Sequence, residues 1–269
     1  MEYSAEWTIE NFSLEETLFC GQCFLWTRRE DGGFDGATGG RPLILSQHGS
    51  ILTARSSRPI DRDALLRYLG LDEDYAHIQT LLSQNETLRT AISYAPGIRV
   101  MKQPLWEALV CFIVSQNNNI PRITGILERF CRCFGGVCED GHPVFPDADT
   151  LARCTVDDLA PLRCGFRAKY LIDAAQKYAG GLLSETLLRT APLNEARAHL
   201  MTVYGVGPKV ANCVLLFGAQ RYDAFPEDVW IKRAMARLFP QGLPEYALPY
   251  AGIAQQYIFH YARTSGIFA

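Results

Sequence analysis

The sequence predicts an α+β fold in which a small antiparallel β domain precedes a larger all-α region. Short β-branched or aromatic runs and glycine-rich turns fill about the first ninety residues. From Pro96 onward, apolar residues recur at helical spacing between prolines and glycines. No internal repeat of fixed period is present. We therefore expect an antiparallel β-sheet domain with accompanying helices over residues 1–94 and an all-α region of two lobes over residues 95–269.

The N-terminal part predicts a meander of strands followed by helices. DGGFDGATGG (31–40) is typical of a turn, since its glycines accept positive φ. Residues 56–85 then change to helical spacing, with Leu65, Leu66 and Leu69 on one side. The expected strands are GQCFLWT (21–27), RPLILSQ (41–47) and SILTARS (50–56).

The C-terminal part predicts a succession of helices. QPLWEALVCFIVSQ (103–116) is apolar nearly all round, which predicts a buried central helix. The helices expected after it are IPRITGILERFCRCFG (120–135), DADTLARC (147–154), TVDDLAPL (155–162), RAKYLIDAAQKYAGG (167–181), NEARAHLMTVYG (194–205), PKVANCVLLFG (208–218), EDVWIKRAMARLF (227–239) and YAGIAQQYIFHYART (250–264).

Composition excludes several classes of protein. The apolar runs are shorter than the roughly 20 residues of a membrane helix, and no signal-peptide pattern opens the chain, so we expect a cytoplasmic protein without a membrane partner. Nine scattered cysteines predict reduced thiols. CRCFGGVCEDGH (131–142) fits zinc spacings poorly, and no cluster of cysteines follows Cys213, so we expect no metal or iron–sulfur site.

The net charge of −3 does not by itself indicate nucleic-acid binding, but the charge is unevenly distributed. Phe112 to Phe134 contains three arginines against one glutamate, and 166–177 is also locally basic. Charge alone leaves two interpretations open: a phosphate-binding face, or amphipathic helices with arginine on the solvent side.

The stretch VYGVGPKVANC (203–213) predicts a helix-hairpin-helix within residues 195–217. Gly205 ends the first helix, and Pro208 suits the first position of the second. The backbone of Gly205, Val206 and Gly207 and the free amides of the second helix form an anion site suited to a DNA phosphate. A cation on the hairpin carbonyls could add to it, although no side-chain ligands are present.

Lys209 lies in the first turn of the second helix, where a cation opposes the helix dipole. This position favours the uncharged amine that a Schiff-base nucleophile requires, whereas the simpler interpretation is a phosphate contact. Asp228 begins a later helical run, either as an N-cap or as a carboxylate that assists an attacking amine. The residues alone leave both pairs of alternatives open.

GVGPKVANC followed by FPEDVWIKR resembles the helix-hairpin-helix DNA glycosylase superfamily. CGQCFLW, SQNNNIPRITGILERFCRCFG and YAGIAQQYIF are similar to stretches of the 8-oxoguanine DNA glycosylase family, and the five segments occur in family order between Gly21 and Phe259. The resemblance implies that Lys209 is the nucleophile that attacks the sugar and that Asp228 assists it. It also implies that the Gly21 carbonyl accepts a hydrogen bond from the N7–H that distinguishes 8-oxoguanine from guanine.

The expected base pocket is consistent with helical spacing. Lys209 and Cys213 are four residues apart, as are Gln255 and Phe259, so each pair shares a helical face. A flipped purine needs a flat apolar sandwich, which Cys213 and Phe259 can form, and an amide, which Gln255 supplies. Taken singly, Cys213 and Phe259 are also typical core residues.

For the opposite strand, the resemblance implies that Asn117 fills the space of the extruded base and that Arg122 and Arg167 bind the orphaned cytosine. Phe166 lies where the family usually has a tyrosine wedge. From the residues alone, Asn117 could be part of a polar loop and the arginines could be phosphate contacts.

Two positions depart from the family pattern. Leu25 occupies a position of the GQ-x-F-x-W motif that commonly holds arginine, and Trp230 stands where eukaryotic members have histidine. We expect the departures to change affinity and turnover more than the type of reaction.

Together these features predict a monomeric, bifunctional 8-oxoguanine DNA glycosylase/AP lyase that acts on double-stranded DNA opposite cytosine and needs no redox cofactor. The alternatives are a monofunctional alkylated-base glycosylase, which would use water and an aspartate, and a non-catalytic helix-hairpin-helix DNA-binding protein.

Overall fold

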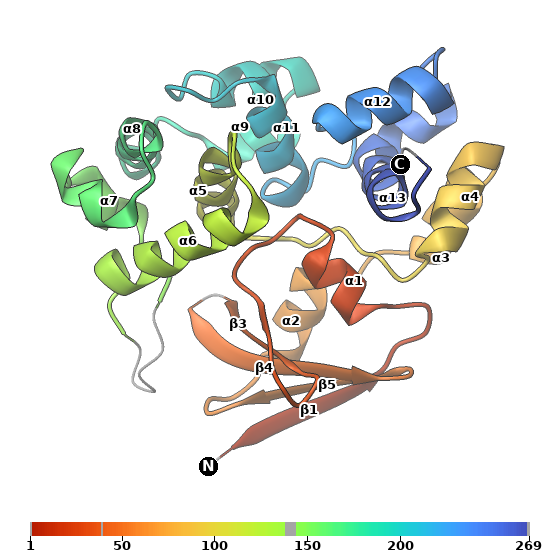
Figure 1. Cartoon of the computed structure of the whole chain (residues 1–269), viewed down its shortest axis with the longest axis horizontal. Coiled ribbons are helices and arrows are strands. Elements are labelled where there is room, and N and C mark those ends of the chain that lie inside the picture. The colour runs from red at the N-terminus through yellow and green to blue at the C-terminus, as the bar shows by residue number, and fades with distance from the viewer. Residues whose placement is uncertain (1, 39, 138–143, 268–269) are drawn as a thin grey trace.

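A computed structural model describes residues 2–38, 40–137 and 144–267 of the 269-residue chain. Its N-terminal part contains one antiparallel sheet with the strand order β1-β5-β4-β3-β2 (Figure 1). The expectation of an antiparallel β domain is therefore confirmed. The strands are β1 (Tyr3–Thr8), β2 (Thr27–Arg28), β3 (Phe34–Thr38), β4 (Arg41–His48) and β5 (Ile51–Ser56).

One face of the sheet is buried because apolar residues alternate along its central strands. Leu43 and Leu45 of β4 and Leu52 and Ala54 of β5 are buried, and Leu45 pairs with Ala54. In the same core lie buried residues of the two short helices that follow the sheet's first and last strands, α1 (Leu14–Phe19) and α2 (Arg62–Tyr68).

The segments at 21–27 and 31–40 differ from expectation. GQCFLWT is a loop except for Thr27, which opens β2, so the predicted strand is wrong. The glycine-rich segment instead contains β3, whose Gly36 lies against Trp26: a Cβ at Gly36 would come within 2.3 Å of the indole. Trp26 thus packs on the sheet rather than joining it, and the glycine makes room for its ring, whereas Phe24 packs against Phe112 of the helical region.

The remaining chain is helical, as expected, and α5 is its centre. Every residue of α5 from Leu105 to Val114 is buried, and the helix packs against α6, α8 and α11 (Figure 1). No helix in the described residues is long and apolar enough to cross a membrane. The helices are α3 (Tyr75–Leu82), α4 (Glu86–Tyr94), α5 (Leu105–Ser115), α6 (Ile120–Phe134), α7 (Ala148–Ala152), α8 (Arg167–Ala179), α9 (Glu185–Thr190), α10 (Leu193–Leu200), α11 (Pro208–Phe217), α12 (Val229–Leu238) and α13 (Ala251–Thr264), with 3-10 turns η1 (Asp157–Leu162) and η2 (Glu245–Tyr250).

The hydrophobic cores do not divide at residue 94. Buried residues of α3 and α4 belong to the large helical core, and α4 packs against α13. The two helices therefore close the C-terminal lobe even though they precede the predicted boundary, as Figure 1 shows at its right-hand side. The sheet, α1 and α2 form the smaller core.

Glu107 is the buried carboxyl of α5. It is 7% exposed, and no hydrogen bond or ion pair to its side chain occurs within the described part of the chain. Burial raises the pKa of Glu107 to about 7. The folded protein therefore holds a proton on this group at a pH at which the unfolded chain releases it.

We expect Glu107→Gln to be more stable than the parent protein at pH 8 and equally stable near pH 4.5. The pKa rises from 4.5 to about 7 on folding, so the parent's stability falls relative to the variant as pH rises between these values. The shift corresponds to about 3 kcal/mol at most. Urea unfolding of both proteins from pH 5 to pH 8 measures the difference, and a difference that does not change with pH would contradict the prediction.

Candidate active site

The helix-hairpin-helix is formed by α10, the turn at Gly205 to Gly207, and α11. Gly207 caps α11 in extended conformation without a side-chain hydrogen bond, and Pro208 occupies the first turn. The first amides of α11 therefore have no side-chain acceptor. Val206 is buried, so only its backbone is available to a ligand.

The first helix ends earlier than its apolar spacing predicts. α10 stops at Leu200, and the next residues form turns instead of continuing to Gly205. Asp173 of α8 accepts a hydrogen bond from the Tyr204 amide at 2.7 Å, and Lys177 of α8 donates to the Thr202 carbonyl at 2.5 Å. These side chains supply partners that a continued helix would have supplied from its own backbone.

Position 205 requires glycine for two reasons, its backbone conformation and the close approach of the Tyr170 ring. Its φ is +78°, and a Cβ would come within 2.5 Å of the Tyr170 ring. Tyr170 also packs edge-on against Tyr204, with ring centroids 5.1 Å apart. The hairpin is thus fixed to α8 by an aromatic ring as well as by Asp173.

Lys209 lies at the exit of the hairpin, in a partly buried position. Its amine lies 5.5 Å from the centroid of the Phe112 ring and acts to lower the pKa of the Cys213 thiol. Burial raises the pKa of the Cys213 thiol in spite of the nearby amine, so Cys213 is neutral and apolar at neutral pH. The expected pairing of Lys209 and Cys213 on one face of α11 is present.

Asp228 begins α12 and lies near this pair. Its carboxylate accepts a hydrogen bond from the Ile231 amide at 2.8 Å, which is the N-cap geometry. Its charge acts to raise the pKa of Cys213, so the carboxylate is within electrostatic range of the thiol. No ion pair joins Lys209 and Asp228 among the described residues, and the amine is therefore not held by a salt bridge.

Gly21 and Phe259 meet although they are far apart in sequence. Gly21 has a φ of +91°, and a Cβ there would lie 3.4 Å from the Phe259 ring. Gln22 fixes the loop that contains Gly21. Its side-chain amide donates to the carbonyls of Thr17 and Arg99 and accepts from the amide of Met101. The phenyl ring therefore lies beside a backbone whose position is fixed by buried hydrogen bonds.

Gln255 is buried on the face of α13 that carries Phe259. Its carbonyl oxygen accepts from Gln256, whose own oxygen accepts from the Cys20 thiol at 3.4 Å. The NH₂ group of Gln255 has no partner among the residues that the structure describes. The chain of bonds from Cys20 orients the amide so that its donor side is left for a ligand.

The loop before α6 presents Asn117 in an exposed, left-handed conformation with a φ of +46°. Arg122 is exposed, and its side chain has no partner among the described residues. Arg167, in contrast, is 2% exposed and donates to the carbonyls of Gln116, Asn117 and Cys164. Arg167 thus holds the Asn117 loop in place, and burial lowers the pKa of its guanidinium.

Phe166 precedes α8 and is 47% exposed. The guanidinium of Arg167 lies 4.5 Å from the centroid of its ring, and the ring contacts Tyr170 edge-on. An exposed aromatic ring whose backbone attachment is fixed is suited to insertion between stacked nucleobases.

The structure brings the expected residues together in three groups, around Lys209, around Phe259 and around Asn117. A cavity of about 900 Å³ lies apart from these groups, between the sheet and α6. Cys138 and His142 of the cysteine-rich segment lie outside the described residues, so that segment stays untested.

Two consecutive family models match the chain. Residues 5–109 match the N-terminal domain of 8-oxoguanine DNA glycosylase, and residues 110–243 match the HhH-GPD superfamily of base excision DNA repair proteins. The chain belongs to the 8-oxoguanine DNA glycosylase family. The second match contains the hairpin, Lys209 and Asp228, and the first contains the Gly21 loop.

Solved structures of this family have the same fold over nearly the whole chain. The structure of MBOgg1 in complex with a low-affinity DNA ligand is 39% identical, with a TM-score of 0.89 over 98% of this chain and 96% of that one. The Clostridium acetobutylicum 8-oxoguanine glycosylase/lyase, in complex with double-stranded DNA containing cytosine opposite 8-oxoG, is 33% identical, with a TM-score of 0.86 over 96% of this chain and 94% of that one.

A Saccharomyces cerevisiae N-glycosylase/DNA lyase is 35% identical over 192 residues, which is 64% of this chain. The match spans 50% of the yeast protein, so the chain covers about half the length of that curated relative.

Sequence reasoning missed the residues that position the site. Gln22, Asp173 and Gln256 act through hydrogen bonds between segments far apart in sequence, and those of Gln22 and Gln256 are buried. Gln22 belongs to the GQ-x-F-x-W motif and Gln256 to the YAGIAQQYIF segment, but the motifs give no indication of their distant partners.

Proposed function

We propose that the chain is a bifunctional DNA glycosylase/AP lyase that excises 8-oxoguanine opposite cytosine in double-stranded DNA. The observation that carries the proposal is the position of Lys209 at the hairpin exit, beside a neutral thiol and a phenyl ring and without an ion pair. Among the described residues no ion pair holds this amine, so its nitrogen is available for attack on a bound sugar. The Clostridium enzyme, bound to DNA with cytosine opposite 8-oxoG, supports the choice of lesion and opposing base.

In the proposed reaction the Lys209 amine attacks the sugar C1′ of the flipped nucleotide. A carbon–nitrogen bond to the protein forms as the glycosidic bond breaks, and the oxidised base leaves with the bonding electrons and takes up a proton. Loss of the amine proton and ring opening give an imine, and removal of a 2′ proton then expels the 3′ phosphate. Asp228 stabilises the cationic sugar and accepts the amine proton.

The proposed base pocket lies between Gly21, Gln255 and Phe259. The Gly21 carbonyl accepts from the N7–H of 8-oxoguanine and repels the N7 lone pair of guanine, so selectivity acts as a penalty on the normal base. The free NH₂ of Gln255 donates to the Watson–Crick edge, and the Phe259 ring covers one face of the purine.

The proposed contacts to the opposite strand come from the loops before α6 and α8. Asn117 occupies the space of the extruded base, and the Phe166 ring holds the stack open. Arg122, whose guanidinium has no partner among the described residues, is available to the orphaned cytosine. Arg167 reaches cytosine only by giving up part of its bonding to the loop carbonyls, so its role combines loop support with recognition.

Borohydride trapping tests the proposal directly. Reduction of a reaction on an 8-oxoguanine:cytosine duplex is expected to leave protein and DNA covalently joined, because only an imine is converted to a stable amine. Base release without a trapped product would indicate a monofunctional glycosylase that uses water. Absence of both would indicate a protein that binds DNA without chemistry.

We expect Gln255→Ala and Phe259→Ala each to slow base excision by about 10- to 100-fold, the effect of losing one buried hydrogen bond or one stacking face. Affinity for undamaged duplex should stay within about two-fold, since neither residue lies at the hairpin. Single-turnover excision and filter binding measure the two quantities. His260→Ala, on the same helix, serves as the control, and an equal loss of affinity for undamaged DNA would contradict a role in base recognition.

A further inference from the structure

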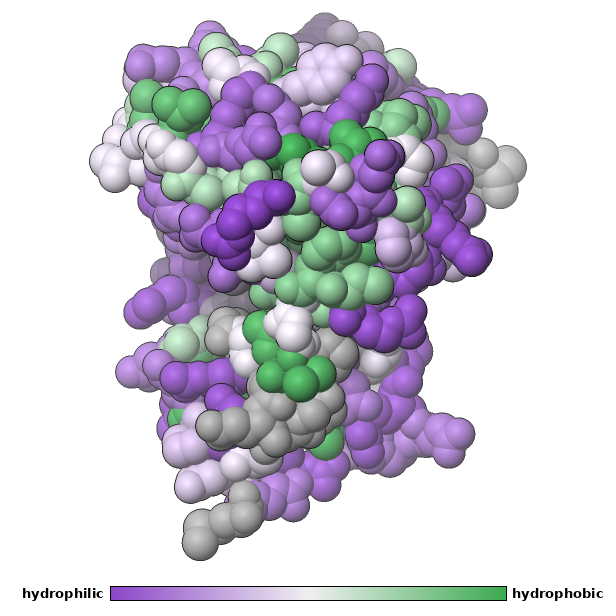
Figure 2. All heavy atoms as spheres, turned by 90° about the vertical axis from the view of Figure 1, so that its left-hand side faces the viewer, coloured by the Kyte–Doolittle hydropathy of each residue, from purple (hydrophilic) through white to green (hydrophobic). Residues whose placement is uncertain are grey.

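A cavity of about 900 Å³ lies between the sheet and helices α5 and α6, away from Lys209. Strands β3, β4 and β5 form one wall, and the other includes Glu107, Cys131 and Phe145. Most of the lining is apolar, and its volume is within the range of sites that enclose small molecules. Figure 2 shows the side of the molecule on which α6 and the β3 edge lie, where apolar side chains gather down the middle between hydrophilic flanks.

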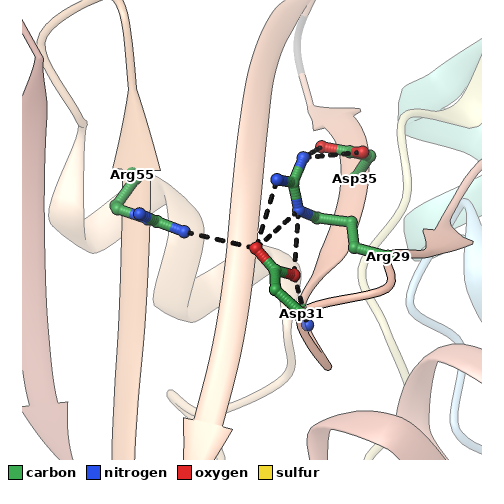
Figure 3. A network of polar contacts seen from close by, with 5 residues as sticks. Arg29, Asp31, Asp35 and Arg55 are labelled. Atoms are coloured by element: carbon green, nitrogen blue, oxygen red, sulfur yellow. Dashed lines mark hydrogen bonds and ion pairs between the residues drawn. The ribbon is translucent and has the colours of Figure 1, made fainter.

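The arginines that the sheet contributes to this cavity already have anionic partners. Arg29 bonds Asp31 at 3.1 Å and Asp35 at 3.0 Å, and Arg55 lies 3.9 Å from Asp31 (Figure 3). Arg132 and Glu128 of α6 also line the cavity, and both are exposed to solvent. The cationic side chains of the sheet are therefore not free to neutralise a further carboxylate.

Glu107 differs from the other charged groups of the cavity. It is more than nine-tenths buried, it lines the cavity, and its carboxyl has no hydrogen bond or ion pair among the described residues. Leu25 lines the same cavity and supplies no charge, at the motif position that commonly holds arginine. Burying a carboxylate without a partner costs desolvation free energy. A cation that binds beside it in the cavity offsets that cost.

We propose that this cavity, hereafter the Glu107 cavity, binds a compact organic cation whose amine, amidine or guanidine group pairs with Glu107 and whose apolar body contacts the walls. An anion is disfavoured because Glu107 repels it and the arginines of the sheet are already paired. A wholly apolar ligand leaves the carboxyl without a partner. The proposal is independent of the glycosylase activity, since no lining residue belongs to the proposed catalytic or base-binding groups.

Binding of such a cation requires the ionised form of Glu107, so it tightens as pH rises from 6 to 8. The pKa of Glu107 is about 7 because of burial. The groups that face it from α2, the Gly21 loop, α5 and α6 have raised pKa values and stay neutral in this range: Tyr68, Cys23, Cys111 and Cys131. The other charged groups that line the cavity are the paired arginines and aspartate on the sheet side, and Glu2, Glu128 and Arg132.

Calorimetric titration of the 269-residue chain with benzamidine and with benzamide tests the proposal. The two compounds have nearly the same shape, and only benzamidine is charged. At pH 8 benzamidine is expected to bind at least about ten-fold more tightly than benzamide, and this preference should decrease at pH 6. Equal affinities, or no binding of either compound, would overturn the proposal.

Two variants locate the site. Glu107→Gln should reduce benzamidine affinity by at least about ten-fold and leave benzamide binding unchanged. Leu25→Arg should compete with benzamidine by placing a guanidinium beside Glu107, and a Leu25→Met control should not. Circular dichroism melts confirm that each variant is folded. Benzamidine binding that survives both Glu107→Gln and Leu25→Arg would show that the compound binds elsewhere and would refute the assignment.

Discussion

Lys209→Gln is expected to retain binding to lesion-containing duplex and to lose base release, strand cleavage and borohydride trapping together. Glutamine keeps much of the length and polarity of lysine but has no nucleophilic nitrogen. The single-turnover excision rate should fall on the order of 10⁴-fold or more, as when other covalent nucleophiles are removed. Gel shifts on damaged duplex and single-turnover excision measure binding and chemistry separately.

Lys232→Gln is the matched control, because Lys232 is an exposed lysine of α12, outside the helix-hairpin-helix segment. A phosphate anchor at Lys209 would give a different pattern. Affinity for damaged and undamaged DNA would then fall equally, and excess protein would restore excision. Full excision by Lys209→Gln at saturating protein would rule out the nucleophilic role.

Asp228→Asn is expected to lower the single-turnover excision rate by about 10²- to 10⁴-fold, the usual contribution of a positioned acid–base group. The thermal midpoint should change little, because asparagine caps helices as well as aspartate does and can still accept from the Ile231 amide. The variant therefore separates the two roles that one carboxylate has at this position.

Asp147→Asn provides the comparison for the cap alone, since Asp147 caps α7 by the same hydrogen bond to the amide three residues later. Its melting temperature and excision rate should both match those of the parent protein. If Asp228→Asn excises at the parent rate, Asp228 is a helix cap and nothing more.

The sequence was most informative where local chemistry determines structure. Glycine, proline and lysine at 205–209 specify a turn, a helix start and a charge that the helix dipole opposes, and the structure contains the turn and the helix. Spacing of four residues placed Cys213 beside Lys209. Family order then related Gly21 to Phe259, which local chemistry could not have connected.

The sequence was least informative where partners are distant. The run GQCFLWT has strand composition, but Gln22 bonds Thr17 of α1 and Arg99 of the segment before α5, and Trp26 lies on Gly36. α10 ends early because Asp173 and Lys177 bond the segment after it. Arg167 was expected to face cytosine, and no local pattern indicates that it also bonds three carbonyls. Each difference arises from a contact between segments that periodicity does not relate.

The attachment of the hairpin to α8 has a consequence for movement along DNA. Asp173 and Tyr170 tie the turn at Gly205 to the helix that starts beside Phe166, so these parts move as one body. In the proposed complex, a duplex with a phosphate at the turn would therefore meet the phenyl ring at a constant offset. We expect the protein to test base steps in register with the phosphate repeat, one nucleotide for each advance, rather than by independent motion of a probe.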